Sequence, residues 1–326
     1  MNLKILSLSL LMLFSNWIIY AKKEATLTTI NRPYYLRADD NQIYISEPSA
    51  ISIFHLSNFK LVKKFGQTGE GPSEFKHYPM IEILPQGIVV NTYGKMLVFS
   101  KDGKFLNEKR KSLFNFHTFP VGNNFVTLTR VIKPKLKSLI ILLDKDFKVI
   151  KEIGSKESKT KRRDIEATKD YFMYCIEDDK IFLGDTAKGF LIEVFDGKGN
   201  KLYQIKKNYK PLKVTETFKN RVLKKLKNTK NRILKSANRR GYKAGFKEYF
   251  PAFEFIRVTK GKIYAFTFNF LKSEREVLIF DLKGNLQNRV FVPDVSKNRS
   301  CISNDKFYYL KENEDAEEWE LFSVDL

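Results

Sequence analysis

The chain has 326 residues, 43% of them hydrophobic, and can bury a large core in one big domain or two ordinary ones. Its formal net charge of +22 favours an anionic partner or surface. No later apolar run is comparable with the first 21 residues, which excludes a protein that crosses a membrane many times.

Those first 21 residues have the pattern of an export signal. Lys4 supplies a basic start, residues 5–20 are almost unbroken apolar, and Ala21 precedes two lysines. Ile19 stands three residues before a cut after Ala21, where a small residue is preferred, so retention as an N-terminal membrane anchor stays open. We expect residues 1–21 to be a signal peptide and the mature chain to be secreted or periplasmic.

The rest of the chain repeats one unit. Each unit contains a predicted β-hairpin. It consists of a run of apolar residues, a turn rich in Asp, Asn, Gly and Lys, and a second run in which apolar residues alternate with polar ones. Two further short strands precede each hairpin, and the first turn residues, Asn58, Asp102 and Asp146, recur every 44 residues. Four strands in about 40–50 residues is typical of a β-propeller blade. Six copies predict an all-β fold, a six-bladed β-propeller over residues 22–326.

The sixth copy stops at Leu326, before its fourth strand. Residues 24–30 alternate like a strand, and we expect them to supply this missing outer strand. Such a closure ties both ends of the chain together and covers a sheet edge.

An insertion at residues 206–250 interrupts the repeat between blades four and five. It holds 16 Lys or Arg and two Glu. Phe218, Val222 and Leu226 recur at helical spacing, and Ile233 and Ala237 continue the pattern. We expect one amphipathic helix of about six turns, which begins at a Thr215 or Thr217 cap and ends at Gly241.

The charge of this insertion has two interpretations. One is a solvated helix face packed by its apolar stripe. The other is contact with an anionic membrane surface or an acidic polysaccharide, through Lys224, Lys225, Lys227, Arg239 and Arg240. Nucleic acid fits the charge but not the export signal, so we expect no nucleic-acid partner.

The glycine-rich stretch FGQTGEGPSEF, residues 65–75, invites comparison with phosphate-binding loops. A P-loop needs Lys and then Ser or Thr at the start of a helix, whereas Pro72 and Ser73 follow Gly71 and a strand comes next. A dinucleotide site needs a βαβ unit, which the sequence lacks. We therefore interpret the glycines as shaping a connection from blade one to blade two, in which Glu74 accepts hydrogen bonds from the local backbone.

The same stretch resembles the blade-to-blade linker of NHL-type and related six-bladed propeller proteins of bacterial envelopes. The matching residues are Phe65, Gly66, Gly69, Gly71, Pro72, Glu74 and Phe75, with Pro79 at the start of the next inner strand. The resemblance covers the mature chain by repeat count, but only this stretch is specific. It implies binding or scaffolding and carries over no catalytic residue.

Metal and catalytic motifs find little support. The three histidines, His55, His77 and His117, lack ligand spacing, and no Gly-x-Ser-x-Gly elbow is present. Four aspartates fall in turns where Asp is expected anyway, although a Ca²⁺ site built from them stays open: Asp39, Asp40, Asp178 and Asp179. Carboxylates from distant blades leave no local spacing. We expect no catalytic residue, no metal and no cofactor.

One repeat position predicts the functional site. Cys175 and Cys301 occupy the same point of blades four and six, too far apart to pair, so we expect two free, mostly buried thiols. The equivalent residues elsewhere are Arg37, Glu82, Phe119 and Arg257. Their neighbours along each strand point into the blade packing, so this position faces the propeller axis. Arg37 and Glu82, on adjacent blades, can form a structural ion pair, or the set can form an anion-binding channel mouth centred on Arg257.

These observations favour an exported, non-catalytic, monomeric propeller that binds a protein, a glycan or another anionic envelope component. The alternative is a propeller hydrolase or lyase that acts on carbohydrate or another small molecule. A third hypothesis is an envelope-tethered interaction module that uses the basic helix.

Overall fold

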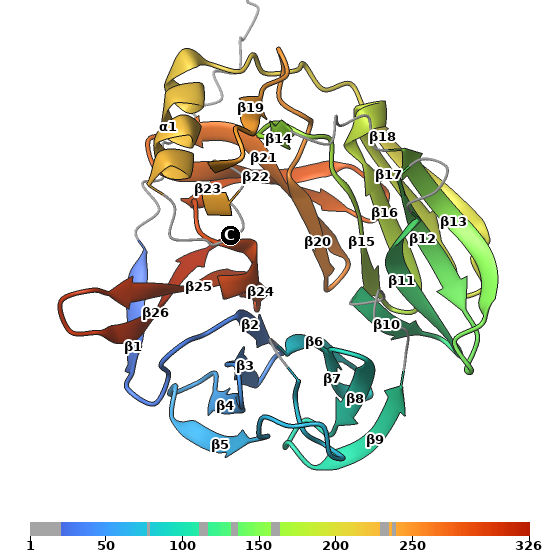
Figure 1. The fold of residues 1–326 in the computed structure, drawn as a ribbon, viewed down its shortest axis with the longest axis vertical. Helices are drawn as coiled ribbons and strands as arrows, with labels where there is room; N and C mark the ends of the chain where they lie inside the picture. The colour runs from blue at the N-terminus through green and yellow to red at the C-terminus, as the bar shows by residue number, and fades with distance from the viewer. Residues whose placement is uncertain are drawn as a thin grey trace, which may run out of the picture.

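Six four-stranded antiparallel sheets stand around a central axis in the computed structural model (Figure 1). The structure describes residues 21–76, 79–110, 117–131, 136–157, 164–228, 235–236 and 239–326. The predicted six-bladed β-propeller is thus confirmed. Residues 1–20, which contain most of the expected signal, and His77 lie outside the described residues.

The first three blades follow the chain from the inner to the outer strand. Blade one consists of β2 (Tyr35–Ala38), β3 (Gln42–Ser46), β4 (Ile51–His55) and β5 (Leu61–Phe65). Blade two consists of β6 (Met80–Leu84), β7 (Gly87–Thr92), β8 (Lys95–Phe99) and β9 (Phe105–Arg110). Blade three consists of β10 (His117–Val121), β11 (Asn124–Val131), β12 (Lys137–Leu143) and β13 (Val149–Glu157).

The last three blades complete the ring, and blade six takes its outer strand from the start of the chain. Blade four consists of β15 (Phe172–Glu177), β16 (Lys180–Asp185), β17 (Phe190–Phe195) and β18 (Lys201–Lys207). Blade five consists of β20 (Phe255–Thr259), β21 (Lys262–Leu271), β22 (Glu274–Asp281) and β23 (Leu286–Pro293). Blade six consists of β24 (Ser300–Ser303), β25 (Lys306–Asn313), β26 (Glu318–Asp325) and β1 (Lys22–Leu27).

The core lies between neighbouring blades. Successive residues of a strand point to opposite sheet faces, and both faces of a blade are covered by its neighbours. In β3, Ile43 and Ile45 pack in the cluster shared with blade six, whereas Tyr44 packs in the cluster shared with blade two. The middle strands therefore carry apolar residues at consecutive positions.

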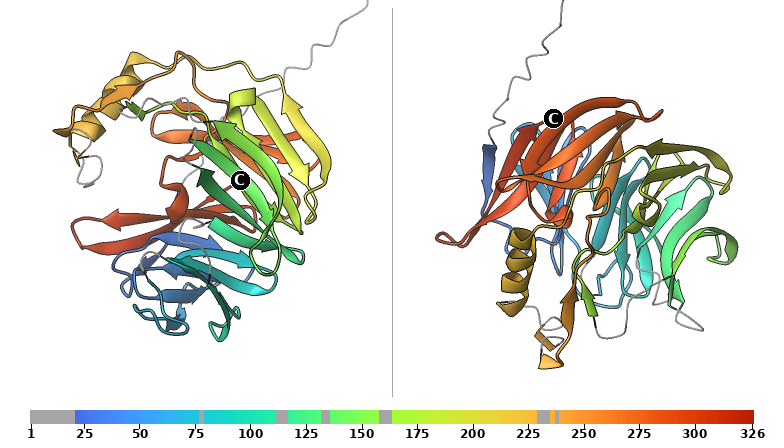
Figure 2. Two further views of the ribbon diagram at one scale, coloured as in Figure 1. Left: turned by 45° about the vertical axis from the view of Figure 1, so that its right-hand side comes forward. Right: turned by 90° about the horizontal axis from the view of Figure 1, so that it is seen from above.

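The antiparallel strand order gives the propeller two different faces. One, which we call the connection face, carries the links from each outer strand to the next inner strand. The other, the hairpin face, carries the turns between first and second strands and between third and fourth strands. The insertion belongs to a blade-to-blade link and projects from the connection face, as the right-hand view of Figure 2 shows.

Strand β1 closes the ring as the sequence predicts. It pairs antiparallel with β26, with Leu27 opposite Trp319, and Ser323 Oγ donates a hydrogen bond to Glu24 Oε1 (2.6 Å). Leu27 is 3% exposed and Ile30 is 2% exposed. Both pack among residues of blades one and six, so the two ends of the chain share one core cluster.

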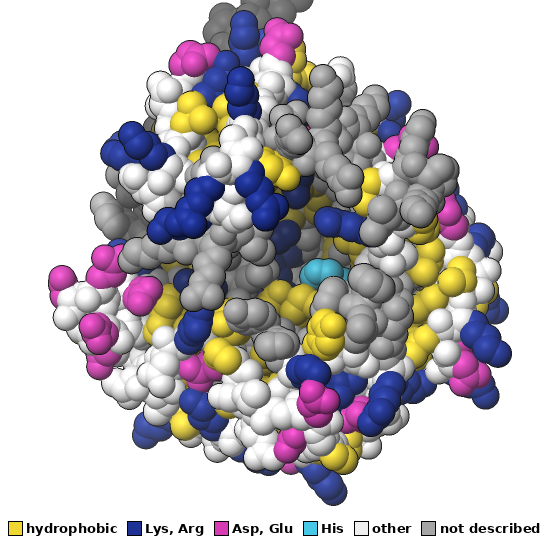
Figure 3. All heavy atoms as spheres, in the orientation of Figure 1, with side chains coloured by type: hydrophobic (Ala, Val, Ile, Leu, Met, Phe, Trp, Pro, Cys, Tyr) yellow, Lys and Arg dark blue, Asp and Glu magenta, His cyan; other side chains and the backbone are white. Residues whose placement is uncertain are grey.

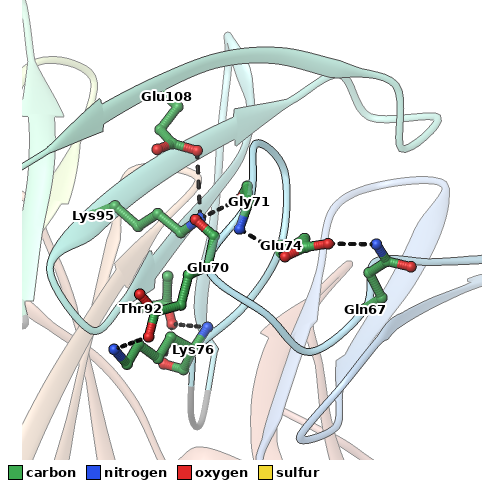
Figure 4. Close-up of polar contacts among 8 residues, drawn as sticks. All are labelled: Gln67, Glu70, Gly71, Glu74, Lys76, Thr92, Lys95 and Glu108. Carbon is green, nitrogen blue, oxygen red and sulfur yellow. Dashed lines mark hydrogen bonds and ion pairs between the residues drawn. The ribbon is translucent and has the colours of Figure 1, made fainter.

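The glycine-rich stretch forms the link between blades one and two (Figure 4). Gly71 N–H donates to Glu74 Oε2 (2.7 Å), and Gln67 Nε2 donates to Glu74 Oε1 (2.6 Å). Gly66 has φ +92°, and a Cβ there would lie 2.3 Å from the ring of the buried Phe75. The role predicted for Glu74, as an acceptor for the local backbone, is confirmed.

A buried lysine from blade two holds the tip of this link. Lys95 Nζ donates to the carbonyl oxygen of Gly71 (2.7 Å) and lies 3.4 Å from Glu108 Oε2. Because the Lys95 side chain is only 7% exposed, these contacts replace water around its charge. The link therefore has a structural role in joining the two blades.

The insertion contains helix α1 (Glu216–Lys227), which lies between β18 and β20. Thr215 caps the helix as predicted, since its hydroxyl accepts a hydrogen bond from Phe218 N–H (3.2 Å). The helix has 12 residues and ends at the Asn228 cap, so the expectation of about six turns is wrong. Ile233 and Ala237 lie outside the described residues. No helix in the described ranges is long and apolar enough to cross a membrane.

Aromatic packing fixes the insertion to blade five. Phe218 of α1 contacts Phe250 edge to face (4.7 Å between ring centroids), and Phe250 stacks on Phe268 of β21 (4.9 Å). After α1 the chain forms β19 (Lys243–Gly245), which pairs in parallel with β14 (Asp164–Glu166) in the link before blade four. The insertion thus contacts one other blade link and one sheet.

Beneath this aromatic group lies a largely buried arginine. Arg275 Nη2 lies 2.7 Å from Asp294 Oδ1, and its Nη1 contacts Glu254. Its guanidinium also lies over the rings of Phe268 (5.8 Å) and Phe270 (5.1 Å). Arg275 therefore connects Asp294, which follows β23, with Glu254, which precedes β20, and it packs against the aromatic rings on which the insertion rests.

Candidate functional site

A cavity of about 650 Å³ occupies the propeller axis and is lined by the inner strands of all six blades. Figure 3 shows the hollow at the centre of the connection face, surrounded by hydrophobic and basic side chains. The six repeat-equivalent residues all line this cavity: Arg37, Glu82, Phe119, Cys175, Arg257 and Cys301. Their flanking residues Ile81, Ile256 and Val258 are buried between blades, as the strand alternation predicts.

Arg37 and Glu82 form the ion pair that the sequence suggests. Arg37 Nε lies 3.0 Å from Glu82 Oε2, and Arg37 Nη1 donates to the carbonyl oxygen of Leu36 (2.8 Å). The side chains are 13% and 35% exposed, respectively. This pair bridges blades one and two and neutralises the charge of Arg37.

Arg257 has no such partner. Its Nη2 donates to two carbonyl oxygens in the link before blade six, those of Lys297 and of Ser300 (2.9 Å to the latter). Its Nε is buried without a hydrogen bond, and no carboxylate of the described residues forms an ion pair with it. Burial, followed by repulsion from Arg37, lowers the pKa of Arg257 to about 10. Glu82 attracts the guanidinium from beyond ion-pair distance and acts in the opposite direction. The channel thus contains a guanidinium that forms no ion pair with the described residues.

A second cation, Lys297, lines the cavity next to Arg257. The Lys297 side chain is exposed at the cavity wall. Partial desolvation by the surrounding protein and the nearby positive groups Lys169, Arg257 and Arg37 hold the pKa of Lys297 below its usual value, although Glu254 acts in the opposite direction. Lys297 belongs to a short 3₁₀ turn, η2 (Lys297–Arg299). The repeat pattern could not identify it, because the links between blades do not repeat; its only sequence signal is its position directly before β24.

Besides Glu82, the acidic residues of the cavity lie toward the hairpin face, at the end of β15 and in the turn after it. Glu177, Asp178 and Asp179 line this end. Burial raises the pKa of Glu177, although its Oε1 accepts a hydrogen bond from Lys260 N–H (2.7 Å). Asp179 Oδ1 accepts from Gly122 N–H (2.7 Å). The channel is therefore basic toward the connection face and acidic toward the hairpin face.

The histidines and the other turn aspartates do not gather into a metal site in the described ranges, where no cluster of three suitable ligands occurs. His117 lines the cavity, and its carbonyl oxygen accepts a hydrogen bond from Tyr174 Oη (2.5 Å). Asp39 accepts hydrogen bonds from the N–H groups of Asn41 (3.0 Å) and Gln42 (2.9 Å). Asp39 thus has the ordinary role of a turn aspartate.

The two cysteines are free, as predicted from their blades. Cys301 is buried and Cys175 is partly buried. Burial raises the pKa of both thiols, that of Cys301 to about 12. Neither thiol is therefore a reactive thiolate at neutral pH.

We expect a thiol reagent at neutral pH to detect two thiols in the denatured chain and to react slowly with the native protein. The buried thiols need either deprotonation or local opening before attack. Absorbance of released thionitrobenzoate with and without guanidinium chloride measures both quantities. A denatured, unreduced chain with no reactive thiol would contradict this prediction.

The basic residues predicted to contact an anionic surface are exposed on the connection face. Lys224, Lys225 and Lys227 belong to α1, and Arg239 and Arg240 follow it. Phe218 is half-buried against blade five, whereas these five side chains face water. The channel mouth and the insertion therefore present positive charge in the same direction.

The architecture defines the chain as a six-bladed β-propeller whose channel holds an arginine that forms no ion pair with the described residues. No family model matches the sequence, and no curated protein matches it significantly. The NHL-like stretch therefore stays a resemblance.

Solved structures similar to this chain are propellers of distant sequence. BamB from Moraxella catarrhalis is 9% identical with a TM-score of 0.44 and covers 94% of this chain and 100% of its own. Kluyveromyces lactis Hsv2 is 10% identical with a TM-score of 0.40, over 91% of this chain and 98% of its own. The Cps50 (Swd1) β-propeller domain of Myceliophteria thermophila is 11% identical, with a TM-score of 0.41 and the same coverage. Likenesses this distant assign no ligand.

Proposed function

We propose that this protein is an exported propeller, either secreted or periplasmic. In its central channel it binds an anionic group of a protein or glycan partner. The observation that carries the proposal is the Arg257 guanidinium, which forms no ion pair with the described residues and shares the charge of Glu82 with Arg37. Burying an unpaired charge costs stability, and a carboxylate, sulfate or phosphate that reached Arg257 would form charge-assisted hydrogen bonds with it. Lys297, beside it, adds a second positive group.

Binding without catalysis fits the channel better than hydrolysis does. A glycoside hydrolase needs two carboxyl groups that act on the substrate. Glu82 is already engaged by Arg37 (3.0 Å), and Glu177 by the N–H of Lys260 (2.7 Å). Asp179 in turn accepts a hydrogen bond from Gly122 N–H. Among the four carboxyl groups of the described residues that line the channel, only Asp178 has no such contact, so a hydrolase or lyase that uses two of them would require one of these contacts to open.

The insertion fits a role in attracting such a partner. Positive charge gathered on one face raises the local concentration and the association rate of an anionic ligand. Lys224 and Lys225 of α1 face water on the side where the channel opens. An acidic glycan or acidic protein segment would thus meet the insertion first and the channel second.

Replacing Arg257 by alanine is expected to weaken the binding of pyranine, a fluorescent trisulfonate, at least about tenfold. Hydrogen bonds to charged groups contribute about 1.5–3 kcal/mol, and a factor of ten corresponds to about 1.4 kcal/mol. Fluorescence anisotropy at fixed ionic strength measures the dissociation constant.

The matched control is Arg289→Ala, which removes the same charge from a side chain that is 60% exposed on β23, outside the channel. Its effect on pyranine affinity is expected to stay below twofold. Equal affinities of the two variants would refute the role of Arg257, because the dye would then respond only to the overall charge.

A further inference from the structure

Exposed apolar side chains recur at one position of the propeller. Leu61, Phe105, Val149 and Leu286 are the first residues of β5, β9, β13 and β23, and Leu202 is the second residue of β18. Their exposed fractions range from 37% for Phe105 to 64% for Val149. Because outer strands begin at the hairpin face, these five residues form a ring there, which we call the hairpin rim.

This ring is more than scattered surface hydrophobicity, which is normal in soluble proteins. In blades one to three a second exposed apolar residue follows at once: Val62, Leu106 and Ile150. With these three, the rim accounts for eight of the 14 large hydrophobic side chains that are exposed in the described ranges. Four blades thus expose an apolar side chain at the same register, and blade four exposes Leu202 one residue later, at the bulge position that Val62, Leu106 and Ile150 occupy in blades one to three.

A lysine directly precedes the apolar residue in four of these blades. Lys60, Lys104, Lys148 and Lys201 are all exposed. A positive group beside an aliphatic or aromatic side chain is the combination found at the boundary between lipid head groups and acyl chains. The chemistry of the rim therefore matches a lipid surface with anionic head groups.

Blade six carries a different feature at the equivalent position. Its outer strand is β1, which begins at Lys22, and Lys22 pairs with Ser323 near the end of β26. The start of β1 thus lies at the hairpin face. The 21 residues that precede it include the apolar residues 5–20. In blade six, the start of β1 therefore takes the place of the exposed apolar residue, because the apolar residues 5–20 precede it in the chain.

We propose that the hairpin rim is a membrane-facing surface. When the N-terminal segment is retained in a bilayer with anionic head groups, the hairpin face lies against that bilayer, and the channel mouth and the insertion point away from it. The proposal does not depend on which ligand the channel binds. It does imply that the anionic partner of the insertion is something other than this membrane.

The hairpin face also carries carboxylates: Glu177, Asp178 and Asp179 at the end of the channel, and four aspartates in the turns before β9, β13 and β18. The seven lysines in the turns before β5, β9, β13, β18 and β23 outnumber these four aspartates, so the ring of turns keeps a positive balance. Nearer the axis, two further acidic residues are paired with lysines. Asp40 lies 2.5 Å from Lys260 Nζ, and Asp305 lies 2.7 Å from Lys262 Nζ. Both pairs belong to the turns between first and second strands, nearer the axis than the rim. The contact with lipid is therefore assigned to the outer ring.

The test places one fluorophore on each face of the full, uncleaved chain. Val149→Cys reports on the rim (64% exposed) and Leu223→Cys reports on α1 (46% exposed). The native thiols are shielded by burial, so brief labelling at neutral pH favours the new cysteine, and the unsubstituted chain is the blank. Each labelled chain is reconstituted into vesicles of phosphatidylcholine and phosphatidylglycerol that contain a lipid with a shallow nitroxide quencher.

We expect the dye at residue 149 to lose about half of its emission or more, because interfacial side chains reach the head-group and upper acyl region. The dye at residue 223 is expected to keep its emission. Leu61→Cys, on another blade, must repeat the result for residue 149, which covers the case of a poorly folded variant. Equal quenching at both faces, quenching only at residue 223, absence of quenching, or failure of the chain to float with the vesicles would each overturn the proposal.

Discussion

A chain that lacks residues 24–31 is expected to melt at least about 10 °C below the intact protein. The deletion removes β1, uncovers the edge of β26 and leaves Trp319 without Leu27 as its neighbour. Full burial of an aliphatic side chain contributes about 1.5–3 kcal/mol, and two such residues, Leu27 and Ile30, are lost. Each kcal/mol corresponds to roughly 2–4 °C in a chain of 150–250 residues, and somewhat less in a longer one.

Two single substitutions separate the effect of closure from that of shortening the chain. Leu27→Ala is expected to destabilise the protein by about 2–5 kcal/mol, as for other buried leucines. Thr26→Ala, one position earlier on the exposed side of the strand, is expected to change stability by less than about 0.5 kcal/mol. Thermal melts followed by circular dichroism measure both. Equal melts of the deleted and intact chains would mean that β1 does not close the ring.

Replacing Arg275 by alanine is expected to cost about 3–5 kcal/mol, since removal of one partner from a buried ion pair leaves the others uncompensated. The Arg275 side chain is 11% exposed, and its loss leaves Glu254 and Asp294 without their shared cation. It also removes the group that packs over Phe268 and Phe270 beneath the insertion. Urea unfolding followed by tryptophan fluorescence measures the free energy of unfolding.

Arg275→Met tests the cause of that loss. Methionine retains most of the packing but not the charge, so it is expected to be nearly as destabilising as alanine. Arg289→Ala removes an exposed arginine 3.3 Å from the buried Glu276, which keeps its hydrogen bonds from Thr267 Oγ1 and Asn269 Nδ2, so the expected cost is only about 1 kcal/mol. If Arg275→Ala matched Arg289→Ala, the triad would contribute nothing to stability.

The fold could be predicted from the sequence because the four-strand pattern of a blade occurs six times. Each blade has the same turn and the same alternation of apolar and polar residues, so a wrong strand assignment in one blade is revealed by comparison with the other five. The same register predicts that Arg37, Glu82 and Arg257 share one channel, and all three line it. Glu74 could be assigned to the backbone of its own loop because Pro72 and the following strand exclude a phosphate-binding helix start.

Features outside the repeat were harder to predict. Lys297 lines the channel from a blade link whose length and sequence vary, so no register points to it. The length of α1 was overestimated because apolar residues continue at helical spacing beyond Leu226. Asn228 nevertheless ends the helix, and asparagine and threonine, which follow one another there, favour caps and turns over helix interiors.

The pairing of β1 with β26 also bears on how the protein is made. The hydrogen bond from Ser323 to Glu24 joins residues 299 positions apart, and no local contact can substitute for it. During synthesis β1 stays unpaired until the last nine residues, which contain β26, have been made. Long-range pairing of this kind slows folding and leaves strand edges open to other chains. In a chain that ends before β26, β1 and one edge of β25 have no partner strand. Such a chain depends on chaperones to prevent aggregation.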